Sequence, residues 1–429
     1  MMKNMDAKKE MTEIEHELAC RHFLMCVDGI GAATAIKIVE HYGCAGRIWG
    51  LTEKDIRQEQ RMNERQKNNF IECKRRWDLA GELQKLMDKG IKTVSYDDRI
   101  YPGRLREIPD KPFLLYYIGE LPAETMPCVA VIGARMCSEY GRFIAAELAS
   151  GLAKRGIQVV SGMADGIDGI AQRSALEHGG MSYGVLGCGV DVCYPSSNRM
   201  LYQALQIHGG ILSEFPPGTK PEARHFPMRN RIISGLADLI LVIEAKERSG
   251  TRITVNMALE QGKEVYAVPG RITDELSRGC NRMILEGAGV AADINELAEA
   301  AWQAWERICR QVQEEGTGEI AGEREERGKR KNGEEIGKVE KRKEAMEAVG
   351  TDRREKMEAE KDMKKRILQL IRKKGMTADE VFNRLLSQEN GMDKTLNISS
   401  VQGTLSELMI MGEVVCHCGL YEIRTCRMG

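Results

Sequence analysis

The chain has 429 residues, 42% of them hydrophobic, and a formal net charge of −1. This length predicts two or three domains. The nearly neutral balance excludes a protein that is basic overall, so any site for a polyanion must be a local patch. Aromatic residues make up only 5% of the chain, so aliphatic side chains and Met must fill most of the core.

The composition also bears on the cellular compartment. The 13 cysteines are scattered without a C-x-x-C pair, and the polar N-terminal stretch lacks the apolar segment of a secretory leader. No apolar run approaches the ~20 residues that cross a bilayer. We therefore expect a reduced, cytoplasmic protein that makes no membrane contact.

Residues 1–95 have the pattern of a helical domain. Two apolar helices flank Asp28-Gly29-Ile30-Gly31, an arrangement that resembles the helix-hairpin-helix of SAM-like domains. Such a hairpin can offer backbone N–H groups to a DNA phosphate, or its glycines can serve only to tighten the turn. Because the hairpin has no Lys or Arg, both interpretations stay open.

Residues 96–300 alternate short apolar strands with helical segments, which predicts an α/β domain with a parallel sheet. A Pro-rich stretch at 96–121 is expected to add a strand at the sheet edge. The expected core strands are 129–132, 159–160, 185–186, 211–212, 239–243 and 266–268. Because ligands of such sheets bind outside the carboxyl ends of the strands, that rim is the expected functional surface.

Two strand ends on this rim carry candidate DNA-binding residues. Gly133, Ala134 and Arg135 follow the first core strand, and Ser161 and Gly162 end the second. Arg135 could be a surface residue in an ion pair. Its place at a strand end favours contact with a phosphate.

The sharpest local signal is a group of polar and aromatic candidates near the expected start of a helix. They are Arg224, Phe226, Arg229, Asn230 and Arg231. Guanidinium groups bind phosphates and an aromatic ring stacks a base for ~1–3 kcal/mol, which is what a single strand of DNA needs. We expect an exposed Arg-Asn-Arg loop. In the opposing interpretation Arg229 or Arg231 pairs with Asp238 or Glu214 to hold the sheet together, and one of the two is expected to do so.

A further turn, Ser249-Gly250-Thr251, precedes the helix expected at 252–261 and suits a phosphate or a carboxylate. The chain has no P-loop, no G-x-S-x-G nucleophile turn and no His/Cys zinc cluster. The residues of the rim therefore indicate a binding site and not a catalytic one. We expect no catalytic residue, no metal and no cofactor.

The C-terminal part divides into a connection and a small domain. Residues 301–361 are expected to be a linker, because the stretch 314–361 is rich in Glu, Lys, Arg and Gly and poor in apolar residues. Residues 362–429 have the three helices and hairpin of a winged-helix domain. Its stretch 397–416 holds no Lys or Arg, although a recognition helix normally carries basic residues. We expect it to dock on protein or on its own body, not on duplex DNA.

Eight segments resemble the DNA processing protein A family (DprA, also called Smf). They are 129–135, 161–168, 187–195, 213–214, 226–235, 244–254, 268–270 and 279–288. The resemblance is dense over 96–295 and implies a Rossmann-like domain that binds single-stranded DNA, usually as a homodimer through this domain. It also implies protection of incoming strands in natural transformation and help in loading the recombinase RecA.

By position, the resemblance implies phosphate contacts for Arg135, Arg229, Asn230 and Arg231, and close approach of the DNA to the Gly, Ser and Thr residues of the rim turns. The sequence departs from the family twice. Gln172 stands where a His usually follows the Gly-Ile-Asp motif. Ala134 replaces a Ser and removes one hydroxyl donor.

The predicted function is therefore that of a single-stranded DNA-binding protein without enzymatic activity. The alternative is a nucleotide hydrolase of the lysine-decarboxylase-like or phosphoribohydrolase type, which uses P-G-G-x-G-T-x-x-E. Here Ser249-Gly250-Thr251 lacks the leading P-G-G, and Thr254 stands in place of the Glu. A purely structural interaction module is a third option, against which the Arg-Asn-Arg stretch argues.

Overall fold

The computed structural model describes residues 11–318, 365–372, 376–388, 401, 404–405, 408, 414–417 and 420–423. The chain forms two compact units, residues 1–313 and 314–429. In the described part of the chain, no helix is both long enough and apolar enough to span a bilayer.

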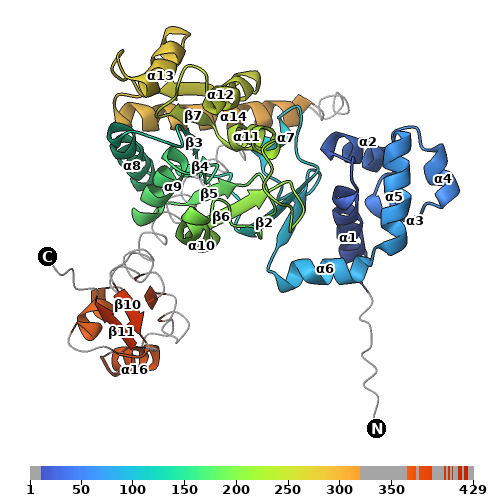
Figure 1. The fold of residues 1–429 in the computed structure, drawn as a ribbon, viewed down its shortest axis with the longest axis horizontal. Helices are drawn as coiled ribbons and strands as arrows, with labels where there is room; N and C mark the ends of the chain where they lie inside the picture. Colours follow the sequence, from blue (N-terminus) through green and yellow to red (C-terminus); the bar gives the residue numbers. More distant parts are fainter. Residues whose placement is uncertain are drawn as a thin grey trace, which may run out of the picture. The chain divides into compact units, whose positions relative to one another are not determined.

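The N-terminal region is helical, as predicted, and is drawn in blue in Figure 1. Its helices are α1 (Glu13–Cys26), α2 (Ala32–Tyr42), α3 (Ala45–Gly50), α4 (Glu53–Gln58), α5 (Glu64–Arg76) and α6 (Leu79–Asp88). Thr12, Thr52 and Asn63 begin three of these helices with reciprocal capping boxes. Phe23 packs edge-on against Phe70 and other aromatic rings, which gives this small domain an aromatic core.

The expected hairpin joins α1 to α2. Gly29 has φ 85°, a left-handed conformation that favours glycine. Helix α5 holds the turn from the side, because Gln66 Nε2 donates to the Gly29 carbonyl at 2.6 Å and Asn69 Nδ2 to the Asp28 carbonyl at 2.9 Å. The turn therefore has a structural explanation, and its contact with DNA stays a prediction.

The centre of the molecule is a nine-stranded sheet with the order β1-β2-β6-β5-β4-β3-β7-β8-β9. The strands are β1 (Lys92–Ser95), β2 (Leu114–Gly119), β3 (Cys128–Ile132), β4 (Gln158–Ser161), β5 (Ser182–Val185), β6 (Gly209–Ser213), β7 (Leu239–Val242), β8 (Glu264–Ala267) and β9 (Gly289–Val290). The strands from β3 to β9 pair in parallel, which confirms the expected core.

The edge next to β6 differs from the rest of the sheet. β2 lies antiparallel to both β6 and β1, so the Pro-rich stretch contributes one strand and the residues before it contribute another. Because β1 already begins at Lys92, the sheet starts before the boundary that was expected at residue 96. The strand β1 has only four residues, of which Val94 alone is apolar, so the sequence pattern did not reveal it.

Helices cover both faces of the sheet (Figure 1). They are α7 (Gly103–Arg106), α8 (Glu139–Lys154), α9 (Ile167–Glu177), α10 (Arg199–Ile207), α11 (His225–Leu236), α12 (Gly250–Glu260), α13 (Glu275–Leu285) and α14 (Ile294–Gly318). Successive residues of β3 face opposite layers. Val129 and Val131 join the cluster of α8, α9 and α14, whereas Ala130 and Ile132 join that of α11, α12 and α13.

Helix α14 crosses the expected boundary at residue 301. Ala301 and Ala304 are buried, and Trp305 Nε1 donates to the Glu124 carbonyl at 3.0 Å. The start of the expected linker is therefore a packed helix, because alanines at helical spacing give it an apolar face within a polar stretch. Residues 319–361 of that linker lie outside the described residues.

The helical domain is fixed to the sheet by polar contacts at β2 and beside β1. Buried His22 Nδ1 lies 2.8 Å from the Tyr116 hydroxyl, and Arg21 Nη2 donates to Asp97 at 2.8 Å. Burial lowers the pKa of His22 to about 4. The imidazole is therefore neutral at pH 7, as a contact inside an apolar junction requires.

In the second unit the structure describes α16 (Ala378–Gln388) and the antiparallel pair β10 (Val414–His417) and β11 (Leu420–Ile423). The expected hairpin is thus confirmed. The third helix expected from residue 399 is described only at 401, 404–405 and 408, which are helical. The winged-helix assignment and its docking on protein stay predictions.

Candidate nucleic-acid interface

The order of the strands locates a site before any side chain is considered. After β3 the chain adds β4, β5 and β6 on one side, and it then returns to add β7, β8 and β9 on the other. The segments that follow β3 and β7 therefore diverge into opposite layers, and such a switch point opens a crevice at the carboxyl ends of the strands.

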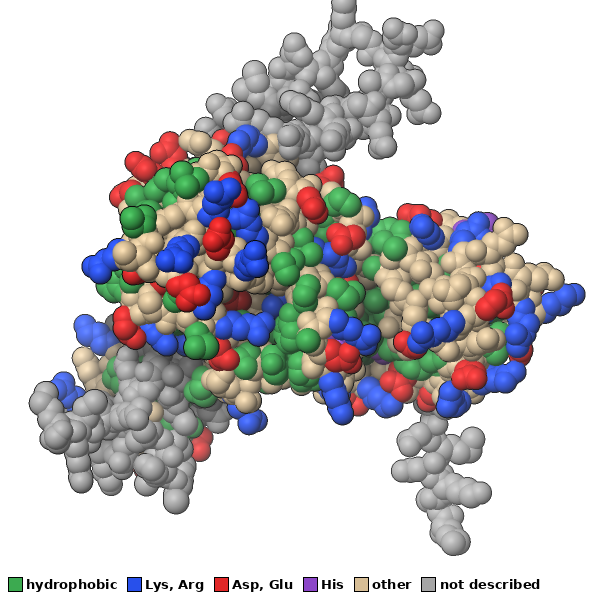
Figure 2. All heavy atoms as spheres, turned by 45° about the horizontal axis from the view of Figure 1, so that its top comes forward, with side chains coloured by type: hydrophobic (Ala, Val, Ile, Leu, Met, Phe, Trp, Pro, Cys, Tyr) green, Lys and Arg blue, Asp and Glu red, His purple; other side chains and the backbone are tan. Residues whose placement is uncertain are grey.

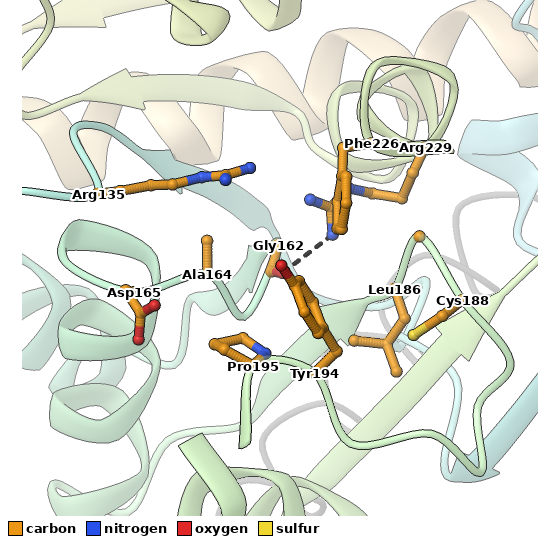
Figure 3. A pocket seen from close by; sticks show the side chains of 11 residues that line it. Arg135, Gly162, Ala164, Asp165, Leu186, Cys188, Tyr194, Pro195, Phe226 and Arg229 are labelled. Atoms are coloured by element: carbon orange, nitrogen blue, oxygen red, sulfur yellow. Dashed lines mark hydrogen bonds between the residues drawn. The ribbon is translucent and has the colours of Figure 1, made fainter. Parts of the chain in front are cut away.

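A groove of about 650 Å³ occupies this crevice. Nine predicted residues line it: Gly133, Ala134, Arg135, Phe226, Arg229, Asn230, Ser249, Gly250 and Thr251. Gly162 lines an adjoining smaller hollow, which Figure 3 shows together with Arg135, Phe226 and Arg229. On the face that Figure 2 shows, Lys and Arg side chains lie interspersed with acidic ones. Segments far apart in sequence are thus brought to one surface.

Two guanidinium groups converge on one aromatic ring in this groove. The guanidinium carbon of Arg135 lies 5.5 Å from the centre of the Phe226 ring, and that of Arg229 lies 6.0 Å from it. Arg135 comes from the loop after β3, whereas Phe226 and Arg229 lie on successive turns of α11. Within the described residues Arg135 has no ion pair, so its charge is available to a ligand.

Arg229 is 4% exposed, yet it lines the groove. Its Nη1 donates to the Gly162 carbonyl at 2.9 Å and also to the Val185 carbonyl. Burial lowers the pKa of Arg229 to about 10, the nearby charge of Asp168 opposes that shift, and the positive charge of Arg135 adds to it. The groove thus holds two neighbouring cations, with the Asp168 carboxylate, which also lines it, beside Arg229.

Arg231 lies elsewhere, and the expectation of an exposed Arg-Asn-Arg loop is wrong. The stretch is a turn of α11, and Arg231 is buried on the side away from the groove. Its Nη2 lies 2.6 Å from Glu214, and its Nε lies 2.9 Å from Asp110. The opposing interpretation therefore holds for Arg231, which pairs with Glu214. Because successive helix residues point about 100° apart, Arg229 and Arg231 lie on different sides of α11. Asp238 instead pairs with Arg104, at 2.8 Å.

Two more predicted residues do not line the groove. The hydroxyl of Ser161 points into the protein and donates to the Val131 carbonyl at 2.6 Å. Arg224 is exposed and pairs with Glu222 at 2.8 Å. Sequence places both next to the rim but does not show on which side of the backbone each side chain lies.

The glycines of the rim have different reasons to be there. A Cβ on Gly133 would lie 2.7 Å from Ile167, and one on Gly162 would lie 2.6 Å from Arg229 Nη2, so both serve packing. Gly250 has open space before it, where a ligand can approach. It begins α12 after Ser249, whose buried Oγ has no partner among the described atoms. This turn is thus a helix N-terminus that opens on the groove, as expected.

Some lining residues were missed. Tyr194 and Pro195 form part of the smaller hollow, with the Tyr194 ring 5.5 Å from that of Phe226. Met136 and Lys246 line the larger groove. An aromatic residue in the long loop after β5 was the available signal for Tyr194, because aromatic side chains in loops often serve binding.

The structure shows the surroundings of Ala134 and Gln172, the two residues at which the sequence departs from the family. Ala134 lines the groove, and its carbonyl accepts from the Ile167 N–H at 3.2 Å. Gln172 is buried and bonds to the backbone of Met163 and Tyr183. Within the described residues no group of three His, Cys, Asp or Glu side chains is arranged to hold a metal ion.

Comparison with known proteins identifies the family of the chain. Residues 92–301 match the model of the family described as DNA recombination-mediator protein A. The DNA processing protein DprA of Streptococcus pneumoniae is 46% identical over 210 residues, which are 49% of this chain and 72% of that protein. The chain belongs to the DNA processing protein A family. This assigns it to DNA processing and recombination.

Two further similarities are to members of the same family. The DprA protein of Bacillus subtilis is 38% identical over 222 residues, 52% of this chain and 75% of that protein. The X-ray structure of DprA from Streptococcus pneumoniae superimposes with a TM-score of 0.57 at 35% identity, covering 67% of this chain and 98% of that one. The Rossmann-like fold expected for this family is thereby confirmed.

Proposed function

We propose that this member of the family binds single-stranded DNA in the groove at the switch point, without catalysing a reaction. The observation that carries the proposal is the convergence of Arg135 and Arg229 on the Phe226 ring. A ring flanked by cations can stack a base while the cations hold the adjoining phosphates. A duplex keeps its bases stacked inside and cannot offer one to the ring.

Attractive groups at a second place in the groove favour a strand of DNA over a single nucleotide as the ligand. Ser249, Gly250 and Thr251 present the N-terminus of the eleven-residue helix α12, and Lys246 lies beside them. Positive helix ends and lysines both attract phosphates. A groove of about 650 Å³ with attractive groups at two places fits a run of nucleotides.

The role in recombination follows from the family. Its description as a recombination mediator supports a protein that protects a strand and passes it to RecA, with DNA and RecA as partners. The hydrolase alternative has less support. Thr254, at the position of its catalytic Glu, is a buried hydroxyl in α12 and cannot act as a carboxylate base.

The proposed function is tested with labelled oligo-dT, a matched duplex and a range of salt concentrations. We expect the single strand to bind more tightly, with an affinity that falls as salt rises by a slope of about 0.7 per phosphate contacted. Equal affinity for duplex, or binding that salt does not change, would contradict the proposal. Release of free base from nucleoside monophosphates would favour the hydrolase.

We also propose a homodimer formed through the far edge of the sheet. A hollow of about 490 Å³ lies over α12, β8 and β9, and Leu259, Leu285 and Val290 are exposed around it. The two-residue strand β9 leaves a sheet edge that a second copy can cover. Exposed apolar side chains at such an edge mark an interaction surface.

Leu285→Asp is expected to convert the dimer to a monomer, because a carboxylate cannot enter an apolar interface without losing its hydration. Sedimentation at several protein concentrations measures the change. Ile207→Asp is the matched control, since Ile207 is also exposed but ends α10 near the other edge of the sheet. A wild-type protein that stays monomeric at high concentration would refute the dimer.

A further inference from the structure

The floor beside the groove is a short loop with an unusual backbone. Gly162, Met163 and Ala164 connect β4 to the segment before α9, and Met163 has φ 54°. Among the described residues it alone combines a side chain at Cβ with a positive φ. Residues with a side chain rarely adopt such a conformation, so the surroundings must hold it.

One part of that support comes from Gln172 on α9. Its Oε1 accepts from the Met163 N–H at 3.1 Å, and its Nε2 donates to the Tyr183 carbonyl on β5 at 3.0 Å. The side chain is fully buried. Gln172 thus ties the left-handed residue to the neighbouring strand through both ends of its amide.

The other part comes from Asn198, which ends the short 3-10 turn Ser196–Asn198. Its Nδ2 donates to the carbonyls of Met163 at 2.9 Å and Ala164 at 3.1 Å, while its Oδ1 accepts from Arg173 at 3.0 Å. Asn198 is 4% exposed. Its amide therefore fixes the carbonyl side of the loop, as Gln172 fixes the N–H side.

The loop in turn holds Arg229. The Gly162 carbonyl accepts from Arg229 Nη1 at 2.9 Å, and the Gly162 N–H donates to Asp168 Oδ2 at 3.1 Å. A Cβ on Gly162 would lie within 2.8 Å of the side chains of both Arg229 and Asp168, so the loop packs tightly against them. A shift of this loop must move the guanidinium group that faces the groove.

We propose that Gln172 and Asn198 are positioning residues for single-stranded DNA. They hold the Gly162–Ala164 loop in its left-handed form, and the loop presents Arg229 to a phosphate. This inference rests on the proposed function, since it assigns to Arg229 the contact that the two amides make possible. Neither amide lines the groove, so both act only through the loop.

The test measures oligo-dT affinity and its salt slope for Gln172→Met and Asn198→Ala, each in the wild-type chain and in the Arg229→Gln chain. In the wild-type chain each change is expected to weaken binding about tenfold and to lower the slope by about 0.7, the loss of one phosphate contact. In the Arg229→Gln chain the same changes should weaken binding no more than about twofold, because the contact they support is already gone.

Ser174→Ala is the matched control. Ser174 is also buried on α9 but donates to the Ala146 carbonyl in α8, so its loss should change the melting temperature and not the affinity. If Gln172→Met does not fold, Asn198→Ala carries the test by itself, because Asn198 holds the other side of the same loop. Unchanged affinity in the folded variants, or equal losses in both chains, would overturn the inference. Failure of the wild-type protein to bind oligo-dT would instead overturn the proposed function.

Discussion

Replacing Arg135 and Arg229 together by Gln is expected to weaken binding of oligo-dT about 100-fold and to lower the salt slope by about 1.4. Each arginine supplies one charged contact whose loss is expected to cost about tenfold, ~1.4 kcal/mol, and each lost phosphate contact lowers the slope by about 0.7 on a single strand. Gln removes the positive charge while keeping a polar side chain at each position. Titration by fluorescence anisotropy at several salt concentrations measures both quantities.

Arg224→Gln is the control for this pair. It removes one positive charge from an exposed residue that lies just before α11 and does not line the groove. Its effect on affinity is expected to be less than about threefold, because an exposed charge acts through screened solvent. A loss for Arg224→Gln as large as for Arg135→Gln would show that the strand runs outside the groove.

Arg231→Met is expected to lower the free energy of unfolding by about 3–5 kcal/mol and to leave the salt slope of the folded protein unchanged. The substitution leaves the carboxylate of Glu214 buried without its cation, which is the costly way to break a buried pair. Unfolding in urea measures the loss. An unchanged stability with a reduced salt slope would instead place Arg231 at the DNA.

The pH dependence of this loss checks its cause. Burial already raises the pKa of Glu214 in the intact pair, and removal of Arg231 takes away the charge that lowers it. Because the folded pKa then lies further above the unfolded value, the destabilisation should grow as pH rises above about 4.5 and should be small in acid. Arg231→Met combined with Glu214→Leu should recover most of the stability, since no unpaired charge remains.

The two arginines of α11 show what sequence alone can decide. Both have the same residue type and lie two positions apart, so composition and motif give them the same predicted role. In the helix they point in different directions, one toward the groove and one toward Glu214. The partner that decides between them, Glu214, lies in the loop after β6, 17 residues earlier in the chain, and the packing of α11 on the sheet brings it there.

The rim glycines make the same point for the backbone. A Gly at a strand end or at the start of a helix predicts a turn or a close approach, and Gly133, Gly162 and Gly250 all lie in such places. The structure shows that Ile167 and Arg229 fill the space at the first two and that only the third is open to a ligand. Gly residues that look alike in sequence thus differ in what occupies the missing Cβ position.

By itself the sequence determined the α/β class, the core strands, the helical start and the rim at which the groove lies. These depend on local apolar patterns and on the direction of parallel strands, which nearby residues encode. The tertiary structure decided which side chains face the groove, which are spent on buried pairs, and that Tyr194, Gln172 and Asn198 surround or support the site. Those choices depend on contacts between segments far apart in the chain, which no local pattern records.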